Sequence, residues 1–192
     1  MGSVGTAITA FSSEIYHSRL EGIQIQDLLD EIEHLQGSDP GVARSNVGGY
    51  HSSPIRPVAS QPMLQTIERL ASQEVRQIAE SLGLGPLRMN GLWANISGPG
   101  DRNEWHIHPF TCLSAVFYAQ VPERSGRLIL ERPDPQSHFW RRSSDDDPRS
   151  RHHLAIQPSA GDLIVFPAYL RHQVEANMSA DLRISCAMNF AY

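Results

Sequence analysis

Two stretches in the first half of the chain carry apolar side chains with the spacing of an amphipathic helix. Residues 24–36 and 63–82 each place an apolar residue at every third or fourth position, and Gly83 follows the second stretch directly. The segment 44–57 between them contains glycine and proline and shows no period, so it is predicted to be a loop.

From residue 88 onward the pattern changes to short runs typical of strands, separated by turn residues. The stretch 132–152 is polar, charged and rich in proline, and is predicted to be a flexible lid loop. Helices followed by about eight strands predict an α+β protein, a cupin-like jelly roll with helices packed on the outer face of one sheet. The predicted strands are 88–97, 104–108, 112–121, 127–131, 153–157, 162–166, 170–176 and 182–190.

The last predicted strand alternates strictly between two kinds of residue. One face is apolar and is expected to pack against the N-terminal helices, while the other is polar or small. Strand 112–121 alternates in a similar way, so the inner face of the jelly roll is expected to surround a site. The polar or small residues of the last strand are Arg183, Ser185, Ala187 and Asn189.

The segment LRHQVEANMSADLRIS predicts a hairpin with its turn at Asn177 and Met178. Symmetric pairing about that turn places His172 directly opposite Arg183, with Ser185 on the same face.

The segment EWHIHPF places His106 and His108 one residue apart on a predicted strand, so both imidazoles point to one face. Such a pair is often no more than two polar residues of a sheet. A third histidine, His172, near an inward arginine favours a metal site, because non-heme iron oxygenases use two histidines and usually one carboxylate.

Taken together, the HxH pair, LSAVFYAQVPERSG, GDLIVFPAYLRHQV and RISCAMNF resemble the 2-oxoglutarate/Fe(II)-dependent oxygenases of the prolyl-hydroxylase-like superfamily. SNVGGYHS resembles the SNxGGW segment of one of its small families, and the resemblance covers roughly residues 44–192. It implies a double-stranded β-helix that holds ferrous iron through His106 and His172. It also implies that Arg183 and Ser185 hold the distal carboxylate of 2-oxoglutarate.

One departure from the superfamily pattern concerns His108, which stands where the usual HxD motif has aspartate. We take His108 as the third ligand. The alternatives are that His108 is a bystander, or that Asp101 or Glu104 substitutes for the missing carboxylate. Three imidazoles also suit zinc or copper.

Three further residues each have two interpretations. Tyr118 and Asn95 fall on inward faces, where they either bind 2-oxoglutarate or are satisfied polar residues of the barrel wall. Trp93 either lines a substrate pocket or is ordinary packing.

The resemblance implies a dioxygenase that uses Fe(II), 2-oxoglutarate and dioxygen, and that hydroxylates, desaturates or cyclises a small molecule. A cupin-like metal-binding protein or isomerase without oxygen chemistry is the alternative from another class. A third interpretation is a relative that keeps the fold and has lost activity.

Length and composition are consistent with one oxygenase domain over residues 1–192, with a helical part over about 1–87 and a jelly-roll core over about 88–192. The net charge of −5 argues against general nucleic-acid binding, and no apolar run is long enough to span a membrane. Cys112 and Cys186 fit no metal-binding spacing and are expected to be reduced thiols of a cytoplasmic protein. The oligomeric state, a homodimer included, is left open.

Overall fold

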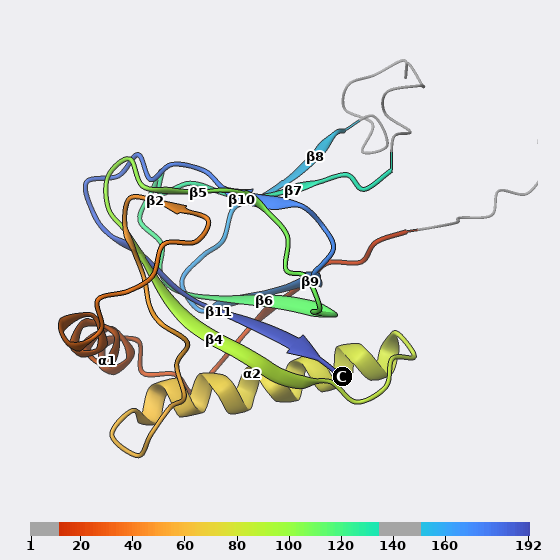
Figure 1. Ribbon diagram of the computed structural model, residues 1–192, viewed down its shortest axis with the longest axis horizontal. Helices are drawn as coiled ribbons and strands as arrows, with labels where there is room; N and C mark the ends of the chain where they lie inside the picture. Colours follow the sequence, from red (N-terminus) through yellow and green to blue (C-terminus); the bar gives the residue numbers. More distant parts are fainter. Residues whose placement is uncertain (1–11, 135–150) are drawn as a thin grey trace, which may run out of the picture.

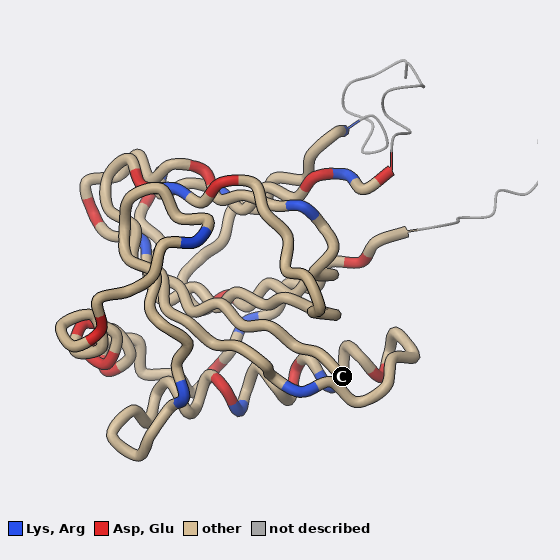
Figure 2. The backbone as a smooth tube through the Cα atoms, viewed as in Figure 1, with Lys and Arg blue, Asp and Glu red and all other residues tan. Residues whose placement is uncertain are grey.

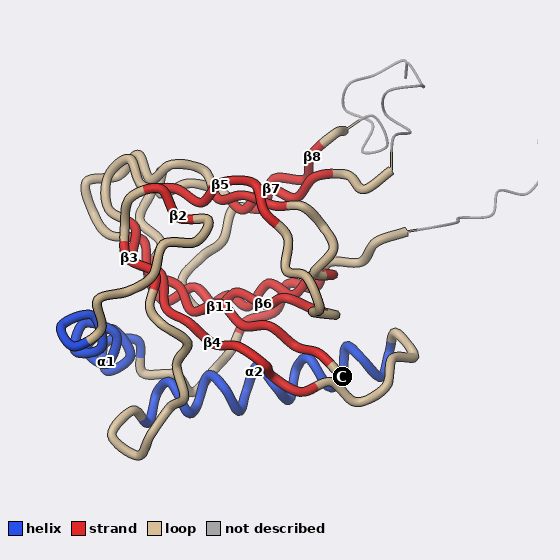
Figure 3. The backbone as a smooth tube through the Cα atoms, viewed as in Figure 1, coloured by secondary structure: helices blue, strands red, loops and turns tan. Residues whose placement is uncertain are grey.

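The computed structural model describes residues 12–134 and 151–192. Two antiparallel sheets face each other, and two helices cover the outer face of the larger sheet (Figures 1 and 3). This is the jelly roll that the sequence predicted. Most of the predicted lid loop, residues 135–150, lies outside the described residues.

The helices are α1 (Ile25–Ser38) and α2 (Pro62–Ser81). The six-stranded sheet has the order β1 (Tyr16–Arg19), β9 (Asp162–Pro167), β6 (Leu113–Gln120), β11 (Arg183–Ala191), β4 (Arg88–Ser97) and β3 (Tyr50–His51). The five-stranded sheet has the order β2 (Asn46–Val47), β5 (Arg102–His106), β10 (His172–Val174), β7 (Leu128–Glu131) and β8 (His153–Ile156).

The two helices support each other at the start of α2. Pro62 occupies the first turn, where its missing N–H costs nothing and its fixed φ suits a helix. The Glu31 carboxylate of α1 accepts the backbone N–H groups of Met63 and Leu64 at 2.8 and 2.9 Å. A carboxylate at this position satisfies free N–H groups and complements the helix dipole, so it replaces the missing N-cap side chain.

The main core lies between the helices and the six-stranded sheet, as the alternation of the last strand predicted. A second, smaller apolar cluster draws residues from both sheets. β11 contributes its even-numbered residues to the main core: Ile184, Cys186, Met188 and Phe190. They belong to the same buried cluster as Leu64, Ile67 and Val75 of α2. The smaller cluster consists of Tyr118, Leu128, Leu130, Ile164, Phe166 and Leu170.

The predicted hairpin between residues 170–176 and 182–190 is wrong. β10 belongs to the five-stranded sheet, where His172 pairs with His106 and Leu130, whereas Arg183 pairs with Ser97 in the six-stranded sheet. The segment between the two strands crosses from one sheet to the other (Figure 1).

Asn177 explains why this segment does not turn back on itself. Its side chain is fully buried, and its amide donates to the carbonyls of Ser97 and Asp181 at 2.9 and 2.8 Å. These bonds anchor the crossing to the end of β4. A residue that reads as the tip of a two-residue turn in the sequence is therefore an internal support.

The remaining elements differ from the prediction mainly at short strands. Each of the predicted strands overlaps an observed one, but β1 was not predicted, and β2 and β3 lie in the segment predicted to be a loop. β2 and β3 have two residues each, which is too few for a period to be recognised, and β1 (YHSR) has no run of apolar side chains.

Charged residues of both signs are interspersed over the described chain, which shows no long basic stripe (Figure 2). None of the helices in the described ranges is long and apolar enough to cross a membrane.

Candidate metal centre

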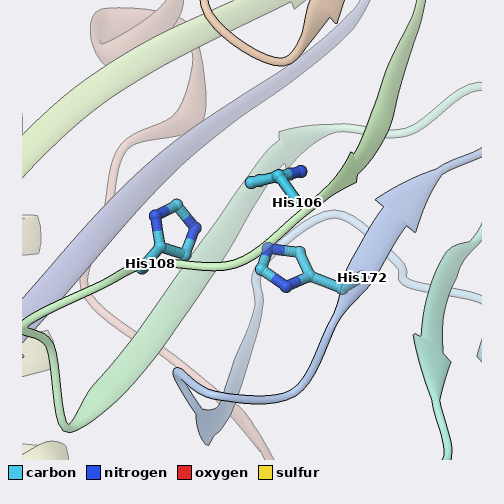
Figure 4. A group of neighbouring side chains, drawn as sticks. All are labelled: His106, His108 and His172. Atoms are coloured by element: carbon cyan, nitrogen blue, oxygen red, sulfur yellow. The ribbon is translucent and has the colours of Figure 1, made fainter.

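Three imidazoles meet on the inner side of the five-stranded sheet (Figure 4). His106 is the last residue of β5 and His172 the first of β10, and the two are directly opposed in the ladder. His108 lies just beyond β5, so it is not the strand residue that the sequence predicted, and its N–H is 3.3 Å from the Ala168 carbonyl. One ligand nitrogen from each ring lies within 4.8 Å of the others.

Backbone carbonyls fix the orientation of two of the rings. His106 Nδ1 is 2.7 Å from the Glu104 carbonyl, and His172 Nδ1 is 2.8 Å from the Leu170 carbonyl. A carbonyl can only accept, so these Nδ1 atoms carry the proton and each Nε2 keeps its lone pair for an ion.

The protonation state of the cluster suits a metal. Burial, together with the neighbouring imidazoles, lowers the pKa of His172 to about 3 and that of His108 to about 4. Burial also lowers the pKa of His106. Neutral imidazole is the form that binds metal, so no ring has to lose a net proton near pH 7.

The residues that were weighed as replacements for the missing aspartate are engaged elsewhere. Asp101 accepts the N–H of Gly98 at 2.7 Å and packs so closely on Gly48 that a Cβ there would lie 1.9 Å from its Oδ1. Glu104 pairs with Arg102 at 2.8 Å. Among the described residues, the histidine cluster is the one group of three or more candidate ligands.

Arg183 is buried on β11, with 3% of its surface exposed. In the described part of the chain its hydrogen bonds all go to neutral oxygens: the carbonyls of Ser125 and Glu175, and Ser97 Oγ at 3.1 Å. Part of its donor fork is therefore unused, and its charge has no carboxylate partner there. Burial lowers the pKa of Arg183, but an arginine stays charged in proteins.

Tyr118 lies beside Arg183 and is also buried, at 2% exposed. Among the described residues its hydroxyl has no hydrogen-bond partner, and burial raises its pKa. A buried hydroxyl without a partner is costly, unless a ligand supplies the partner. A free arginine fork and a free hydroxyl together fit a carboxylate.

A cavity of about 750 Å³ connects these groups. The residues predicted to bind iron or 2-oxoglutarate all line this cavity: His106, His108, His172, Arg183, Ser185, Tyr118 and Asn95. The pairing of β11 with β4 orders one wall of the cavity from an Arg183 end to an Asn189 end. The rise per strand residue separates these ends by roughly 20 Å. The opposed pairs are Arg183 and Ser97, Ser185 and Asn95, Ala187 and Trp93, and Asn189 and Gly91.

Trp93 lines this cavity, so it is more than packing. The His51 ring stacks on it with centroids 5.5 Å apart and an angle of 10°, and His108 lies 5.7 Å away on a tilt. His51 comes from the segment SNVGGYHS, which β3 pairs with β4. These aromatic rings form one wall of the cavity next to the histidine cluster.

Sequence reasoning missed two contacts of the site. Ser97, the partner of Arg183, carries no local signal and is identified only by the pairing of β4 with β11. Asn189 was placed on the inner face, but its contact with His108, at 3.4 Å between Nδ2 and Nδ1, follows only from the tertiary structure.

The fold has many relatives among solved structures, at sequence identities that show the fold alone. A Pseudomonas putida prolyl-4-hydroxylase is 16% identical, with 94% of this chain and 93% of that chain covered and a TM-score of 0.63. The non-heme alpha-ketoglutarate-dependent epimerase SnoN of nogalamycin biosynthesis is 18% identical, with 93% and 76% covered and a TM-score of 0.66. A Trichoplax adhaerens prolyl hydroxylase, solved with a hypoxia-inducible-factor peptide, is 13% identical, with 92% and 83% covered and a TM-score of 0.66.

The fold and the cluster thus define a double-stranded β-helix protein with a metal site of histidines. Residues 91–189 match the model of the family described as "Putative 2OG-Fe(II) oxygenase", and the chain belongs to that family. No curated protein matches the sequence. The protein is a 2-oxoglutarate- and Fe(II)-dependent oxygenase, which decides against the cupin-like alternative without oxygen chemistry.

Proposed function

We propose that His106, His108 and His172 bind Fe(II), and that Arg183, Ser185, Tyr118 and Asn95 bind 2-oxoglutarate for the oxidation of a small molecule. The observation that carries the proposal is that a buried arginine without a carboxylate partner and a buried hydroxyl without a hydrogen-bond partner, both judged over residues 12–134 and 151–192, lie close together. Both line the cavity that contains the histidine cluster.

The donor set fits iron. Three neutral imidazoles suit a borderline divalent ion, and family membership selects Fe(II) among the candidates. Bound iron, with 2-oxoglutarate and dioxygen, supplies the oxidising chemistry through decarboxylation of the keto acid. The other contributions come from the chain, which binds, orients and excludes water.

Charge is the first contribution of the chain. An aspartate ligand would cancel one of the two positive charges of the ferrous ion, whereas three neutral imidazoles leave both in place. The higher local charge and the Arg183 guanidinium both attract dianionic 2-oxoglutarate. Ser185 lies between Asn95 and Tyr118 in the register, so it is placed to contact the same molecule.

The substrate occupies the part of the cavity remote from Arg183, beside Trp93 and Gly91. A space of this total size accommodates 2-oxoglutarate and a second small organic molecule. Hydroxylation is the proposed outcome, with desaturation or ring closure using the same residues. The solved relatives include both hydroxylases and an epimerase, so the fold alone does not select the outcome.

We also assign the enzyme to the cytoplasm, because Cys112 and Cys186 are both free thiols. Cys186 is buried, which raises its pKa to about 12 and keeps it unreactive.

The test of the proposal is 2-oxoglutarate affinity of the iron-loaded, anaerobic protein, followed by the visible charge-transfer band. Arg183→Met removes two charge-assisted bonds, each worth about 1.5–3 kcal/mol, and is expected to weaken 2-oxoglutarate by about 100-fold or more. Arg183→Lys keeps the positive charge but lacks the two-pronged guanidinium, so its 2-oxoglutarate affinity is expected to lie between those of the parent and Arg183→Met. Fe(II) affinity is expected to be unchanged in both variants.

Arg69→Met serves as the matched control, because Arg69 is exposed on α2 and bonds only to Gln73 in the described structure. A parent protein without the band, or Arg183→Met with parental affinity, would contradict the proposed role of the site.

A further inference from the structure

His108 differs from the other two histidines in the group that faces its Nδ1. His106 and His172 face backbone carbonyls, which can only accept a hydrogen bond. His108 Nδ1 faces the side-chain amide of Asn189, with Nδ2 at 3.4 Å. An amide has both a donor end and an acceptor end, so the His108 tautomer depends on which end it meets.

The amide is itself held by a third residue. Ser114 on β6 and Asn189 on β11 are directly opposed, and Ser114 Oγ lies 3.0 Å from Asn189 Oδ1. Ser114 is 2% exposed. A hydroxyl donates or accepts as its neighbour requires, so Ser114, Asn189 and His108 form a chain of hydrogen bonds that can run in either direction.

The two directions have opposite consequences for metal binding. In the arrangement of the structure, Ser114 donates to Asn189 Oδ1 and Asn189 Nδ2 donates to His108 Nδ1, so the proton of the neutral ring is on Nε2. Because Nδ1 is engaged with Asn189, Nε2 is the ring nitrogen available to an ion, and this proton blocks it. If the amide turns over, Nδ2 donates to Ser114 and Oδ1 accepts from His108 Nδ1–H, and Nε2 becomes free.

We propose that Asn189 is a positioning residue for the third ligand, and that metal binding turns its amide over and shifts the proton of His108 from Nε2 to Nδ1. The inference rests on the proposed function, because it takes His108 as a ligand. No net proton is gained or lost, since one ring nitrogen releases a proton and the other takes one up through solvent. The Ser114 hydroxyl reverses from donor to acceptor.

The position of His108 explains why such support is needed. It lies beyond the end of β5, and its backbone is tied to the neighbouring turn through a long bond to Ala168. The ladder that fixes His106 and His172 does not fix its ring. Partners behind a ligating histidine typically change metal affinity by about 10–100-fold, because they fix the tautomer and the ring orientation.

The direct test is the tautomer of each histidine, read from ¹⁵N chemical shifts of the full-length protein labelled at histidine. Spectra are compared for the metal-free protein and the protein loaded with Zn(II) as a diamagnetic probe. His108 is expected to change from the Nε2–H to the Nδ1–H form on loading. His106 and His172 are expected to be Nδ1–H in both states, which makes them internal controls.

Variants provide the second test, with Fe(II) affinity measured anaerobically by competition with a chelator. Asn189→Leu removes the hydrogen bond at similar volume and is expected to weaken Fe(II) by about 10–100-fold. Asn189→Asp offers only an acceptor to His108 Nδ1–H, so it is expected to bind Fe(II) at least as tightly as the parent. Gln120→Ala is the matched control, since Gln120 lies on β6 with Ser114 but bonds to the Leu182 carbonyl outside the cavity.

A double-mutant cycle separates positioning from a general structural effect. In a His108→Ala background, Asn189→Leu is expected to change Fe(II) affinity by less than about 2-fold, because its partner has been removed. Equal losses in both backgrounds would overturn the proposal, as would a His108 tautomer that is the same with and without Zn(II). If Asn189→Leu does not fold, the tautomer comparison on the parent decides.

The outcomes also separate this inference from the proposed function. A parent protein that binds neither Fe(II) nor 2-oxoglutarate refutes the proposed function. A parent that binds both, with unchanged Fe(II) affinity in Asn189→Leu, refutes only the role of Asn189.

Discussion

His106 and His172 are directly opposed residues of β5 and β10, with ring centroids 4.2 Å apart. The ladder between the two strands holds both backbones, and a carbonyl behind each ring sets its tautomer. Two of the proposed ligands are thus fixed before any ion binds, which reduces the ordering that metal binding would require.

His172→Ala removes one of these two proposed ligands. A residue that only hydrogen-bonds a ligating histidine changes metal affinity by about 10–100-fold, so the loss of Fe(II) affinity in His172→Ala is expected to be larger. Turnover of 2-oxoglutarate is expected to be lost. The measurement is anaerobic Fe(II) titration with circular dichroism to confirm the fold. His34→Ala, on exposed α1 surface, is the control. Stoichiometric iron at the same site in His172→Ala would show that His172 is not a ligand.

His108→Asp and His108→Ala test the third ligand. Aspartate restores the two-histidine, one-carboxylate set, so His108→Asp is expected to retain Fe(II) affinity, while His108→Ala loses a ligand and most of that affinity. The added negative charge of His108→Asp is expected to weaken 2-oxoglutarate relative to the parent. If His108→Ala bound Fe(II) as tightly as the parent, His108 would be a bystander.

Tyr118→Phe separates stability from binding. The Tyr118 hydroxyl is buried without a partner in the described structure, so its removal is expected to raise the free energy of unfolding of the ligand-free protein by about 1 kcal/mol. The same change removes the proposed donor to the 2-oxoglutarate carboxylate and is expected to weaken that ligand by about 10-fold. Urea denaturation and titration of the charge-transfer band measure the two effects. Exposed Tyr192→Phe is expected to change neither.

Asp39 gives the segment that carries His51 a dependence on pH. The Ser53 N–H, the Tyr50 hydroxyl and other donors hold the pKa of Asp39 at about 2, below its ordinary value. A lowered pKa stabilises the folded state above pH 4, and this contribution is lost as the pH falls from about 4 to about 2.

Asp39→Asn is therefore expected to lower the urea midpoint at pH 7 and to differ less from the parent at pH 3. Asp30→Asn on the outer face of α1 is the control for the loss of one negative charge. A difference between Asp39→Asn and the parent that is as large at pH 3 as at pH 7 would show that the carboxylate charge is not what stabilises this segment.

The sequence predicted the local features of this protein well. The period of residues 24–36 and 63–82 predicted α1 and α2, and the alternation of the last strand predicted that its even positions face the helices and its odd positions face the cavity. These features depend on near neighbours in the chain, so a repeat along the sequence is enough to reveal them.

The partner of each strand was decided only by the tertiary structure. The hairpin rule paired His172 with Arg183, but the buried amide of Asn177 carries the chain across to the other sheet. His172 therefore lies opposite His106, and Arg183 opposite Ser97. Alternation fixes the face to which a side chain points, whereas contacts between residues far apart in sequence fix the strand that lies beside it. The sequence alone could therefore predict the three histidines that cluster, but neither the partners of Arg183 nor the contact between Asn189 and His108.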